Sequence, residues 1–476
     1  MYYRLSESIA LRSWKFVSRA YYRKNEPYAK GLSKGEFDFL LLCDGEHDIP
    51  ESSLTKALEL KGFIEKCSQG EHPCEWSGHK SYGHRYFPKM NFMITGKCNY
   101  NCLHCFNAAD NAPIMTEWSY EDATDLLKQA KECGIYAFTV TGGEPMLHPR
   151  FMDIVREIYR QGMFLEELNT NGYFIDQKVL DELAETGCDP LIKISFDGLG
   201  CHDWMRDRKG AEERTLAAIR LCIDNGFKVM AQTQVHRRSL HTIFPTVKKL
   251  DSMGVSATRL IRTAEAPRWS NNAPDSCLGI EEYYAEMLDF AEKYKNSGMN
   301  MNVMIWQFMD IYPLSKSYRL KAVLCPDGEY KATDPVCKGN RGMIGVTSGK
   351  DVVPCLQMSG YYEEHGIHLG NLGETSLKEL LTGSEFLSEV CTNLHKFRKS
   401  NKKCDECRYF RWCNGGCPAL GLLFTGERMG SDLSKCLFYE NGWYDKCVSS
   451  MDGWRNLTEI ESFKKTYMGI GLNPPT

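Results

Sequence analysis

The sequence predicts an α/β protein built around a partial TIM-type barrel and followed by a cysteine-rich domain. Three observations predict this organisation: short apolar runs alternate with longer helical patterns across residues 89–312, cysteine and glycine are dense across residues 320–447, and the chain has 476 residues, enough for two or three domains. Alternating strands and helices typically form a parallel sheet with crossover helices. Six such units are too few for a closed eight-stranded barrel, so we expect an open (β/α)6 barrel.

The six expected strands are short apolar runs at 91–94, 137–140, 166–169, 191–195, 229–232 and 257–261. The helices expected to connect them lie at 120–133, 152–161, 177–186, 214–225 and 241–253. In barrels of parallel strands, functional groups gather at the carboxyl ends of the strands. Polar and glycine residues that follow these strands are therefore candidate site residues.

Residues 1–85 are predicted to form a separate small unit. Its two extended stretches and two helices are expected at 10–14, 20–23, 33–42 and 52–61. Ser33 and Glu36 have the spacing of a capping box at the start of the first helix. The segment 66–88 is rich in glycine, histidine, serine and proline, which is typical of a linker.

The region after the barrel has few long helical patterns. Residues 320–447 are therefore predicted to be held together by bound metal more than by a large apolar core. Residues 448–476 are predicted to be a polar tail with one helix.

Composition argues against several kinds of partner. The formal net charge is −4 and there is no long basic run, so we expect no nucleic-acid partner. The longest apolar stretches are far shorter than the ~20 residues that a membrane span needs. The first residues lack a basic start followed by an apolar core, so no secretory signal is expected. These patterns predict a cytoplasmic protein without a membrane contact.

The 21 cysteines are unusual for such a chain, and they indicate metal or redox chemistry. Some stand singly in periodic segments and are expected to be buried apolar thiols; these are Cys43, Cys133, Cys188, Cys222 and Cys391. Two tight groups, at 98–105 and 404–417, do not fit that explanation.

The first group, Cys98, Cys102 and Cys105, directly follows the first expected strand. Soft thiolates select iron–sulfur chemistry over hard cations. Three ligands leave one iron of a cubane cluster open to a further ligand. The alternative is a structural zinc site completed by a fourth, distant residue.

These residues resemble the cluster-binding loop of the radical S-adenosylmethionine (SAM) superfamily, with Phe106 as the aromatic residue that follows the third cysteine. The resemblance continues after the second strand, where Gly142, Gly143 and Glu144 match the family's Gly-Gly-Glu-Pro motif. It implies that the two glycines let backbone carbonyls approach the amino group of SAM.

Four further residues are implied to contact SAM. Ser195 and Asp197 follow the fourth strand and resemble the family's Ser-X-Asp-Gly turn near the cofactor ribose. Arg206 resembles an arginine that binds the cofactor carboxylate, with a surface helix charge as its alternative. His104 occupies a position where the family places an aromatic ring against the adenine, with a solvated loop histidine as its alternative.

The C-terminal cysteines resemble those of the SPASM extension of the superfamily, although five residues separate Gly349 from Cys355 where the family usually has four. The resemblance implies two auxiliary [4Fe-4S] clusters. One is expected to take Cys404, Cys407, Cys413 and Cys436. The other is expected to take Cys337, Cys355 and Cys417, with Cys325 as the candidate fourth ligand. One alternative is that this cluster keeps an open iron. The other is that a pair of zinc ribbons takes the place of both clusters.

The resemblance implies an oxidoreductase with SAM and three [4Fe-4S] clusters, in which a 5′-deoxyadenosyl radical abstracts hydrogen from the substrate. Residues 1–85 resemble a winged-helix domain that binds the leader of a ribosomally made precursor peptide. Cysteine thioether cross-linking, of the sactipeptide or ranthipeptide type, is therefore the first expectation. Peptide epimerisation, carbon–carbon cross-linking and anaerobic sulfatase maturation are the alternatives. A flavodoxin or ferredoxin is the expected electron donor.

Overall fold

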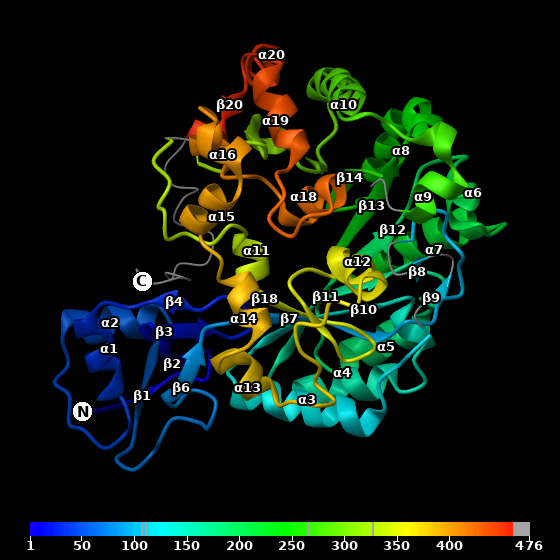
Figure 1. Cartoon of the computed structure of the whole chain (residues 1–476). Helices are drawn as coiled ribbons and strands as arrows, with labels where there is room; N and C mark the ends of the chain where they lie inside the picture. The colour runs from blue at the N-terminus through cyan, green and yellow to red at the C-terminus, as the bar shows by residue number, and fades with distance from the viewer. Residues whose placement is uncertain (106–107, 110–111, 114, 264–266, 326–327, 460–476) are drawn as a thin grey trace.

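The computed structural model describes residues 1–105, 108–109, 112–113, 115–263, 267–325 and 328–459. A sheet of twelve strands dominates this described part of the chain (Figure 1). Its strand order is β19-β18-β7-β10-β11-β12-β13-β14-β15-β16-β17-β20. The long parallel stretch of this sheet confirms the predicted α/β fold.

The parallel strands that form the barrel wall are β7 (Lys89–Thr95), β10 (Ala137–Gly142), β11 (Phe164–Thr170), β12 (Leu191–Ser195), β13 (Val229–Val235), β14 (Ala257–Arg262) and β15 (Asn302–Ile305). The first six contain the six predicted strands. Their apolar residues are almost completely buried, which explains why they form continuous hydrophobic runs in the sequence.

Helices follow these strands along the chain, and the longer ones bury one largely apolar face. They are α3 (Tyr120–Glu132), α4 (Phe151–Arg160), α5 (Gln177–Glu185), α6 (His202–Arg206), α7 (Ala211–Asp224), α8 (Leu240–Ser252), α9 (Pro267–Asn272) and α10 (Ile280–Lys295). In α3, for example, Ala123, Leu126, Leu127 and Ala130 are buried, at the three- and four-residue spacing of one helix face. The five predicted helices correspond to α3, α4, α5, α7 and α8.

The sheet extends beyond the predicted barrel at both ends. On one side β16 (Met309–Tyr312) and β17 (Ser317–Leu320) add antiparallel strands, and β20 (Arg455–Asn456) pairs with β17. On the other side β18 (Met343–Val346) pairs parallel to β7, and β19 (Val352–Val353) completes a hairpin. The cysteine-rich region thus shares its sheet with the barrel.

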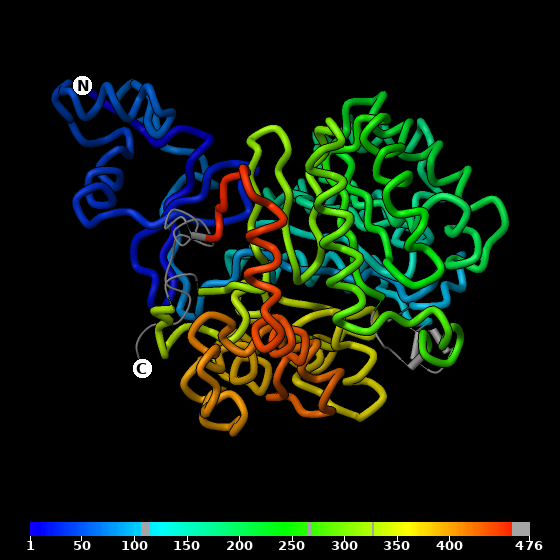
Figure 2. Tube along the Cα trace, turned by 90° about the horizontal axis from the view of Figure 1, so that it is seen from above, coloured from blue at the N-terminus to red at the C-terminus, as the bar shows by residue number. Residues whose placement is uncertain are grey.

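The N-terminal unit lies at one side of the barrel, away from α7 and α8, in both overall views (Figures 1 and 2). Its strands and helices are β1 (Tyr2–Leu5), β2 (Ile9–Lys15), β3 (Val17–Arg23), β4 (Lys30–Gly31), α1 (Lys34–Leu41), α2 (Ser53–Leu60), β5 (Ile64–Cys67) and β6 (Lys80–Arg85). The predicted capping box of Ser33 and Glu36 is confirmed.

The prediction that 66–88 is a linker is wrong in part. Strand β6 lies within it and pairs parallel with β2, which places Lys80 opposite Arg12. Small and polar side chains concealed this strand, because pairing with β2 depends on backbone hydrogen bonds and not on an apolar run.

The C-terminal region consists of short helices around the cysteines. They are α11 (Lys338–Arg341), α12 (Ser359–Glu364), α13 (Leu377–Thr382), α14 (Glu385–Val390), α15 (Leu394–Ser400), α16 (Lys402–Glu406), α17 (Phe410–Cys413), α18 (Pro418–Thr425), α19 (Leu433–Glu440) and α20 (Trp443–Ser450). Of the predicted tail at 448–476, residues 460–476 lie outside the described residues, and helix α20 ends at Ser450 within the described part. None of the described helices combines the length and the apolar character of a membrane span.

Candidate functional site

One large cavity, of about 1110 Å³, lies between the barrel strands and the cysteine-rich region. Its wall includes all three cysteines of the first group, Cys98, Cys102 and Cys105. The same wall includes three cysteines of the C-terminal region, Cys337, Cys355 and Cys417. The structure therefore brings together two thiol groups that are more than two hundred residues apart in sequence.

The position of Cys337 and Cys355 follows from the β18–β19 hairpin. Cys337 directly precedes α11, which leads into β18, and Cys355 lies two residues after the end of β19. Because β18 pairs with β7, this hairpin lies next to the strand that leads into the Cys98 loop. Sequence spacing alone gives no sign of that pairing.

The glycines of the second motif hold the Cys98 loop in place by close backbone contact. The Gly143 amide donates to Thr95 O over 2.8 Å, and the Glu144 amide donates to Lys97 O over 2.8 Å. A Cβ atom at Gly143 would lie 2.3 Å from Lys97 O, and one at Gly142 would lie 2.5 Å from Thr95 O. No side chain fits at either position, so the motif needs glycine for packing, and both glycines also line the cavity.

Glu144 lies behind the cavity wall and is completely buried. Its carboxylate accepts hydrogen bonds from the Thr170 hydroxyl over 2.9 Å and from the Asn171 amide over 2.8 Å. Burial raises the pKa of Glu144 to about 7, against the opposing effect of these hydrogen bonds. The carboxylate thus ties the end of β10 to the end of β11.

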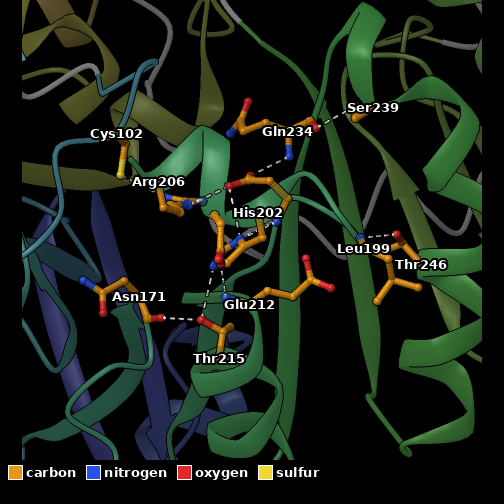
Figure 3. A network of polar contacts seen from close by, with 12 residues as sticks. Cys102, Asn171, Leu199, His202, Arg206, Glu212, Thr215, Gln234, Ser239 and Thr246 are labelled. Atoms are coloured by element: carbon orange, nitrogen blue, oxygen red, sulfur yellow. Dashed lines mark hydrogen bonds and ion pairs between the residues drawn. The ribbon is translucent and has the colours of Figure 1, made fainter. Parts of the chain in front are cut away.

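Asp197, Arg206 and His202 form a buried polar network (Figure 3). Arg206 Nε lies 2.6 Å from Asp197 Oδ2, and the Asp197 amide donates to His202 Nδ1 over 3.0 Å. Burial alone would raise the pKa of Asp197, but the Arg206 guanidinium and the His202 hydrogen bond hold it well below its usual value. Asp197 therefore remains a carboxylate and fixes Arg206.

Arg206 reaches from this network to the cysteine loop and lines the cavity (Figure 3). Its Nη1 donates to Cys102 Sγ over 3.5 Å, and its side chain is buried. The alternative of a surface helix charge is therefore wrong. Ser195 also lines the cavity, whereas Asp197 lies behind Arg206.

His104 lines the cavity, and its Nδ1 is buried without a hydrogen-bond partner among the described residues. Burial and the Arg206 charge lower the pKa of His104 to about 3, so the ring is neutral at physiological pH. A neutral ring on the cavity wall does not fit a solvated loop histidine, and it suits contact with a flat apolar group. Phe106, which follows the loop, lies outside the described residues.

A second, smaller cavity is lined by Cys404, Cys407, Cys413 and Cys436. Burial, together with the neighbouring Cys436 and Cys407 thiols, raises the pKa of Cys404 to about 12. Four thiols gathered around one small cavity are suited to a cationic cluster, because bound iron stabilises the thiolate form of its ligands. This donor set fits the predicted auxiliary cluster.

The three cysteines of the other C-terminal set interact similarly. The pKa of Cys417 is raised by burial, by Asp432 and by Cys337, and burial and Cys337 raise the pKa of Cys355 to about 11. Cys325 is not on the wall that these cysteines share; its amide donates to Trp412 O over 3.0 Å. Its role as a fourth ligand stays a prediction.

Among the described residues, no three Cys, His, Asp or Glu side chains come close enough to hold a single metal ion. The thiols instead surround cavities.

Two contacts at the Cys98 loop were not predicted. Asn171 Nδ2 donates to Asn99 Oδ1 over 2.8 Å, and Arg268 Nε donates to Cys102 O over 3.0 Å. Asn171 follows an expected strand, where candidate site residues are expected, so its place in the sequence could have indicated this contact with the loop. Arg268 lies in α9, and no sequence pattern connects it with the loop.

Comparison with protein families gives two matches. Residues 92–245 match the model described as the radical SAM superfamily, and residues 337–411 match the SPASM model, described as an iron–sulfur cluster-binding domain. The first match contains the Cys98 loop, and the second contains Cys337, Cys355, Cys404 and Cys407.

Individual proteins are similar over most of the chain. The AdoMet-dependent heme synthase of Methanosarcina barkeri is 26% identical over 339 residues, which are 70% of this chain and 92% of that protein. The PqqA peptide cyclase of Gluconobacter oxydans is 23% identical over 358 residues, which are 72% of this chain and 90% of that protein. SuiB of Streptococcus suis, solved bound to its precursor peptide SuiA, has a similar fold with a TM-score of 0.63; it is 15% identical, and the match covers 91% of this chain and 99% of SuiB.

Proposed function

Because the chain is a radical SAM enzyme with a C-terminal SPASM domain, we propose that it modifies a ribosomally made precursor peptide and installs cysteine thioether cross-links. The observation that carries the proposal is the single cavity whose wall holds both Cys98, Cys102 and Cys105 and the C-terminal Cys337, Cys355 and Cys417. A substrate in this cavity would lie between the cysteines that would hold the radical-generating cluster and the cysteines that would hold an electron-accepting cluster.

The residues on the page divide into ligand sets for three [4Fe-4S] clusters. Cys98, Cys102 and Cys105 would hold the radical-generating cluster. One auxiliary cluster would take Cys404, Cys407, Cys413 and Cys436, and the other would take Cys337, Cys355 and Cys417, with Cys325 as the candidate fourth ligand.

SAM would lie against the carboxyl ends of the strands. When SAM is bound and receives one electron, it supplies the chemistry that removes a hydrogen atom from an unreactive C–H bond. Gly142 and Gly143 would present backbone atoms to it, His104 would face its adenine, and Arg206 would bind its carboxylate near Ser195. The polar network of Asp197 fixes the guanidinium before SAM binds.

Thioether formation accounts for both thiol groups on the wall. A carbon–sulfur bond forms while the peptide loses one C–H and one S–H hydrogen. One hydrogen would leave with the adenosyl group that SAM supplies, the remaining proton would pass to solvent, and the cluster held by Cys337, Cys355 and Cys417 would accept the remaining electron.

A peptide substrate is supported by two similar proteins, PqqA peptide cyclase and SuiB with its precursor peptide. The match to SuiB covers 91% of this chain, which is more than the barrel and the SPASM domain contain. We propose that residues 1–85 bind the leader of the precursor peptide, and that a flavodoxin or ferredoxin supplies the electron.

Chemistry on a tetrapyrrole is a second candidate, since the heme synthase of M. barkeri is similar over 92% of its length. Epimerisation, carbon–carbon cross-linking and sulfatase maturation use the same two kinds of cluster site. These candidates differ in their products, so product analysis separates them.

The test is anaerobic reconstitution followed by incubation with SAM, dithionite and a cysteine-containing peptide encoded beside the gene. We expect about twelve irons per chain, 5′-deoxyadenosine, and a peptide that has lost two hydrogens and one free thiol. Solvent deuterium uptake without that loss would indicate an epimerase, and a two-hydrogen loss with all thiols retained would indicate carbon–carbon coupling. Absence of 5′-deoxyadenosine, together with an unchanged outcome in a Cys102→Ala variant, would overturn the radical mechanism.

A further inference from the structure

Lys435 is a buried lysine between the two sets of C-terminal cysteines. It lies in α19, directly before Cys436, and is only 1% exposed. Its side chain lines the smaller cavity together with the four cysteines of that cavity. Burial lowers the pKa of Lys435 to about 8, while Asp432 and the Cys417 and Cys413 thiols oppose this shift. The ammonium is therefore close to a cysteine of each set.

The hydrogen bonds of the Lys435 ammonium go to backbone carbonyls. Its Nζ donates to Gln307 O over 2.7 Å and to Lys321 O over 3.5 Å. Gln307 lies between β15 and β16, and Lys321 directly follows β17, so these bonds join α19 to the edge of the barrel sheet. Among the described residues, no carboxylate oxygen lies within 4.0 Å of Nζ.

Asp432, three residues before Lys435, is buried and is engaged elsewhere. Its Oδ2 accepts a hydrogen bond from the Cys417 amide over 2.9 Å, and its Oδ1 accepts one from the Ser434 amide over 3.0 Å. The carboxylate thus holds Cys417 and the start of α19 in place and forms no ion pair with the ammonium.

The loop between Cys413 and Cys417 packs tightly on Lys435. A Cβ atom at Gly416 would lie 2.8 Å from Lys435 Cγ and 2.5 Å from Asp432 Cβ. Gly416 also has a φ of 79°, which favours glycine. This close approach keeps the lysine side chain against the loop that carries both cysteines.

A buried ammonium without a counter-charge is costly, because hydrogen bonds to neutral carbonyls satisfy its donors but leave its charge unbalanced. Lys193, the other lysine that is almost fully buried among the described residues, lies 2.6 Å from Glu167. For Lys435 the only anionic groups left beside it are cysteine thiolates. Bound iron keeps its cysteine ligands as thiolates, and four thiolates outweigh the positive charge of an iron–sulfur core.

We propose that Lys435 balances the negative charge of the auxiliary clusters and raises their reduction potentials, so that they accept the electron released during cross-linking. A cluster becomes more negative when it accepts an electron, and a cation nearby in a buried site stabilises that reduced form. This inference rests on the proposed auxiliary clusters and adds the residue that favours electron transfer toward them.

The test is a potentiometric titration of the reconstituted full-length chain at one fixed pH, followed by electron paramagnetic resonance. The proteins are wild type, Lys435→Met, Lys435→Gln and Lys435→Arg. In the Met and Gln variants we expect the reduction equilibrium of at least one auxiliary cluster to fall at least about tenfold, which is about 59 mV for one electron. Lys435→Arg retains the charge and should stay within about threefold of wild type.

The matched control is Lys402→Met, which removes an exposed lysine two residues before Cys404. The Lys402 side chain is 88% exposed, so water and salt screen its charge and the potentials should stay within about twofold of wild type. A lysine that served only to join α19 to the sheet would change the stability of the chain and not these potentials.

Potentials that stay within about twofold of wild type in the Met and Gln variants, or that fall equally in Lys402→Met, would overturn the inference. Iron content is measured on every variant. Loss of about four irons in both Met and Gln but not in Arg would support the inference, because only the charge separates them; the same loss in all three would overturn it.

This outcome is separable from that of the proposed function. A wild-type chain that assembles no auxiliary cluster refutes the proposed clusters themselves. Assembled clusters whose potentials do not depend on Lys435 refute only this inference.

Discussion

The buried pair of Asp197 and Arg206 gives a prediction whose size follows from the geometry. Both side chains are almost completely excluded from solvent, and Nε and Oδ2 are 2.6 Å apart. Asp197→Asn would leave the guanidinium buried without its counter-charge. Breaking a buried pair from one side costs about 3–5 kcal/mol. We expect about 3 kcal/mol, because an asparagine oxygen can still accept the Gln234 amide hydrogen bond that Oδ1 now accepts.

The assay is urea unfolding of the reconstituted protein under anaerobic conditions, followed by circular dichroism, for Asp197→Asn, Arg206→Met and the double variant. The double variant should cost about 2 kcal/mol less than the sum of the single variants, because neither charge is then left alone. The matched control is Asp153→Asn, which removes the partner of Arg150 in an exposed pair and should cost less than about 1 kcal/mol. Additive costs, equal within about 0.5 kcal/mol, would refute the reasoning.

The pH dependence of this pair has a definite sign. The pKa of Asp197 is lowered in the folded chain, so its contribution is fully present above the unfolded value of about 3.9 and is lost as pH falls through the folded pKa. The difference between wild type and Asp197→Asn should therefore stay constant between about pH 6 and pH 8. A difference that shrinks across this range would show that Asp197 is not held ionised.

Three further predictions follow from the site. Burial raises the pKa of Glu144 to about 7, so the wild-type chain should lose stability relative to Glu144→Gln as pH rises from about 4.3 through about 7, by up to about 3 kcal/mol. Unfolding experiments on both proteins at pH 5 and pH 8 measure this change. A stability difference that is independent of pH would contradict the prediction. Gly143→Ala should displace the Cys98 loop, because its Cβ would lie 2.3 Å from Lys97 O, and should lower the iron content by about four per chain; an unchanged iron content would contradict it. If Cys325 is the fourth ligand of one auxiliary cluster, Cys325→Ala should change the electron paramagnetic resonance spectrum of that cluster. The control Cys447→Ala should leave the spectrum unchanged. Identical spectra for both variants would exclude Cys325 as a ligand.

The elements that the sequence predicts well are those whose signal is local. The strands from β7 to β14 are apolar because both of their faces are buried, and α3 and its neighbours have one apolar face. The hairpin of β18 and β19 is short and lies among glycines, and its partner β7 is more than two hundred residues away. No pattern within the hairpin predicts that pairing.

The same distinction applies to the site. The spacing of Cys98, Cys102 and Cys105 is local and predicts their common role. Arg259 and Arg319 face the cavity together only because β15 and β16 are in register between β14 and β17, and register depends on the folded sheet. Charged residues of this kind look like ordinary strand residues in the sequence.

The two acidic residues of the recognised motifs have a common structural role. Glu144 accepts hydrogen bonds from Thr170 and Asn171 and so links β10 to β11, while Asp197 accepts from the Gln234 amide and links β12 to β13. Both are completely buried and lie behind the cavity wall, whereas the groups that reach the cavity come from the glycines, Ser195, His104 and Arg206. Each carboxylate therefore joins the ends of adjacent strands, which is where a partial barrel needs support because no further strands close it. The two buried acids fix the carboxyl ends of these strands, and the neutral and cationic groups beside them line the cavity.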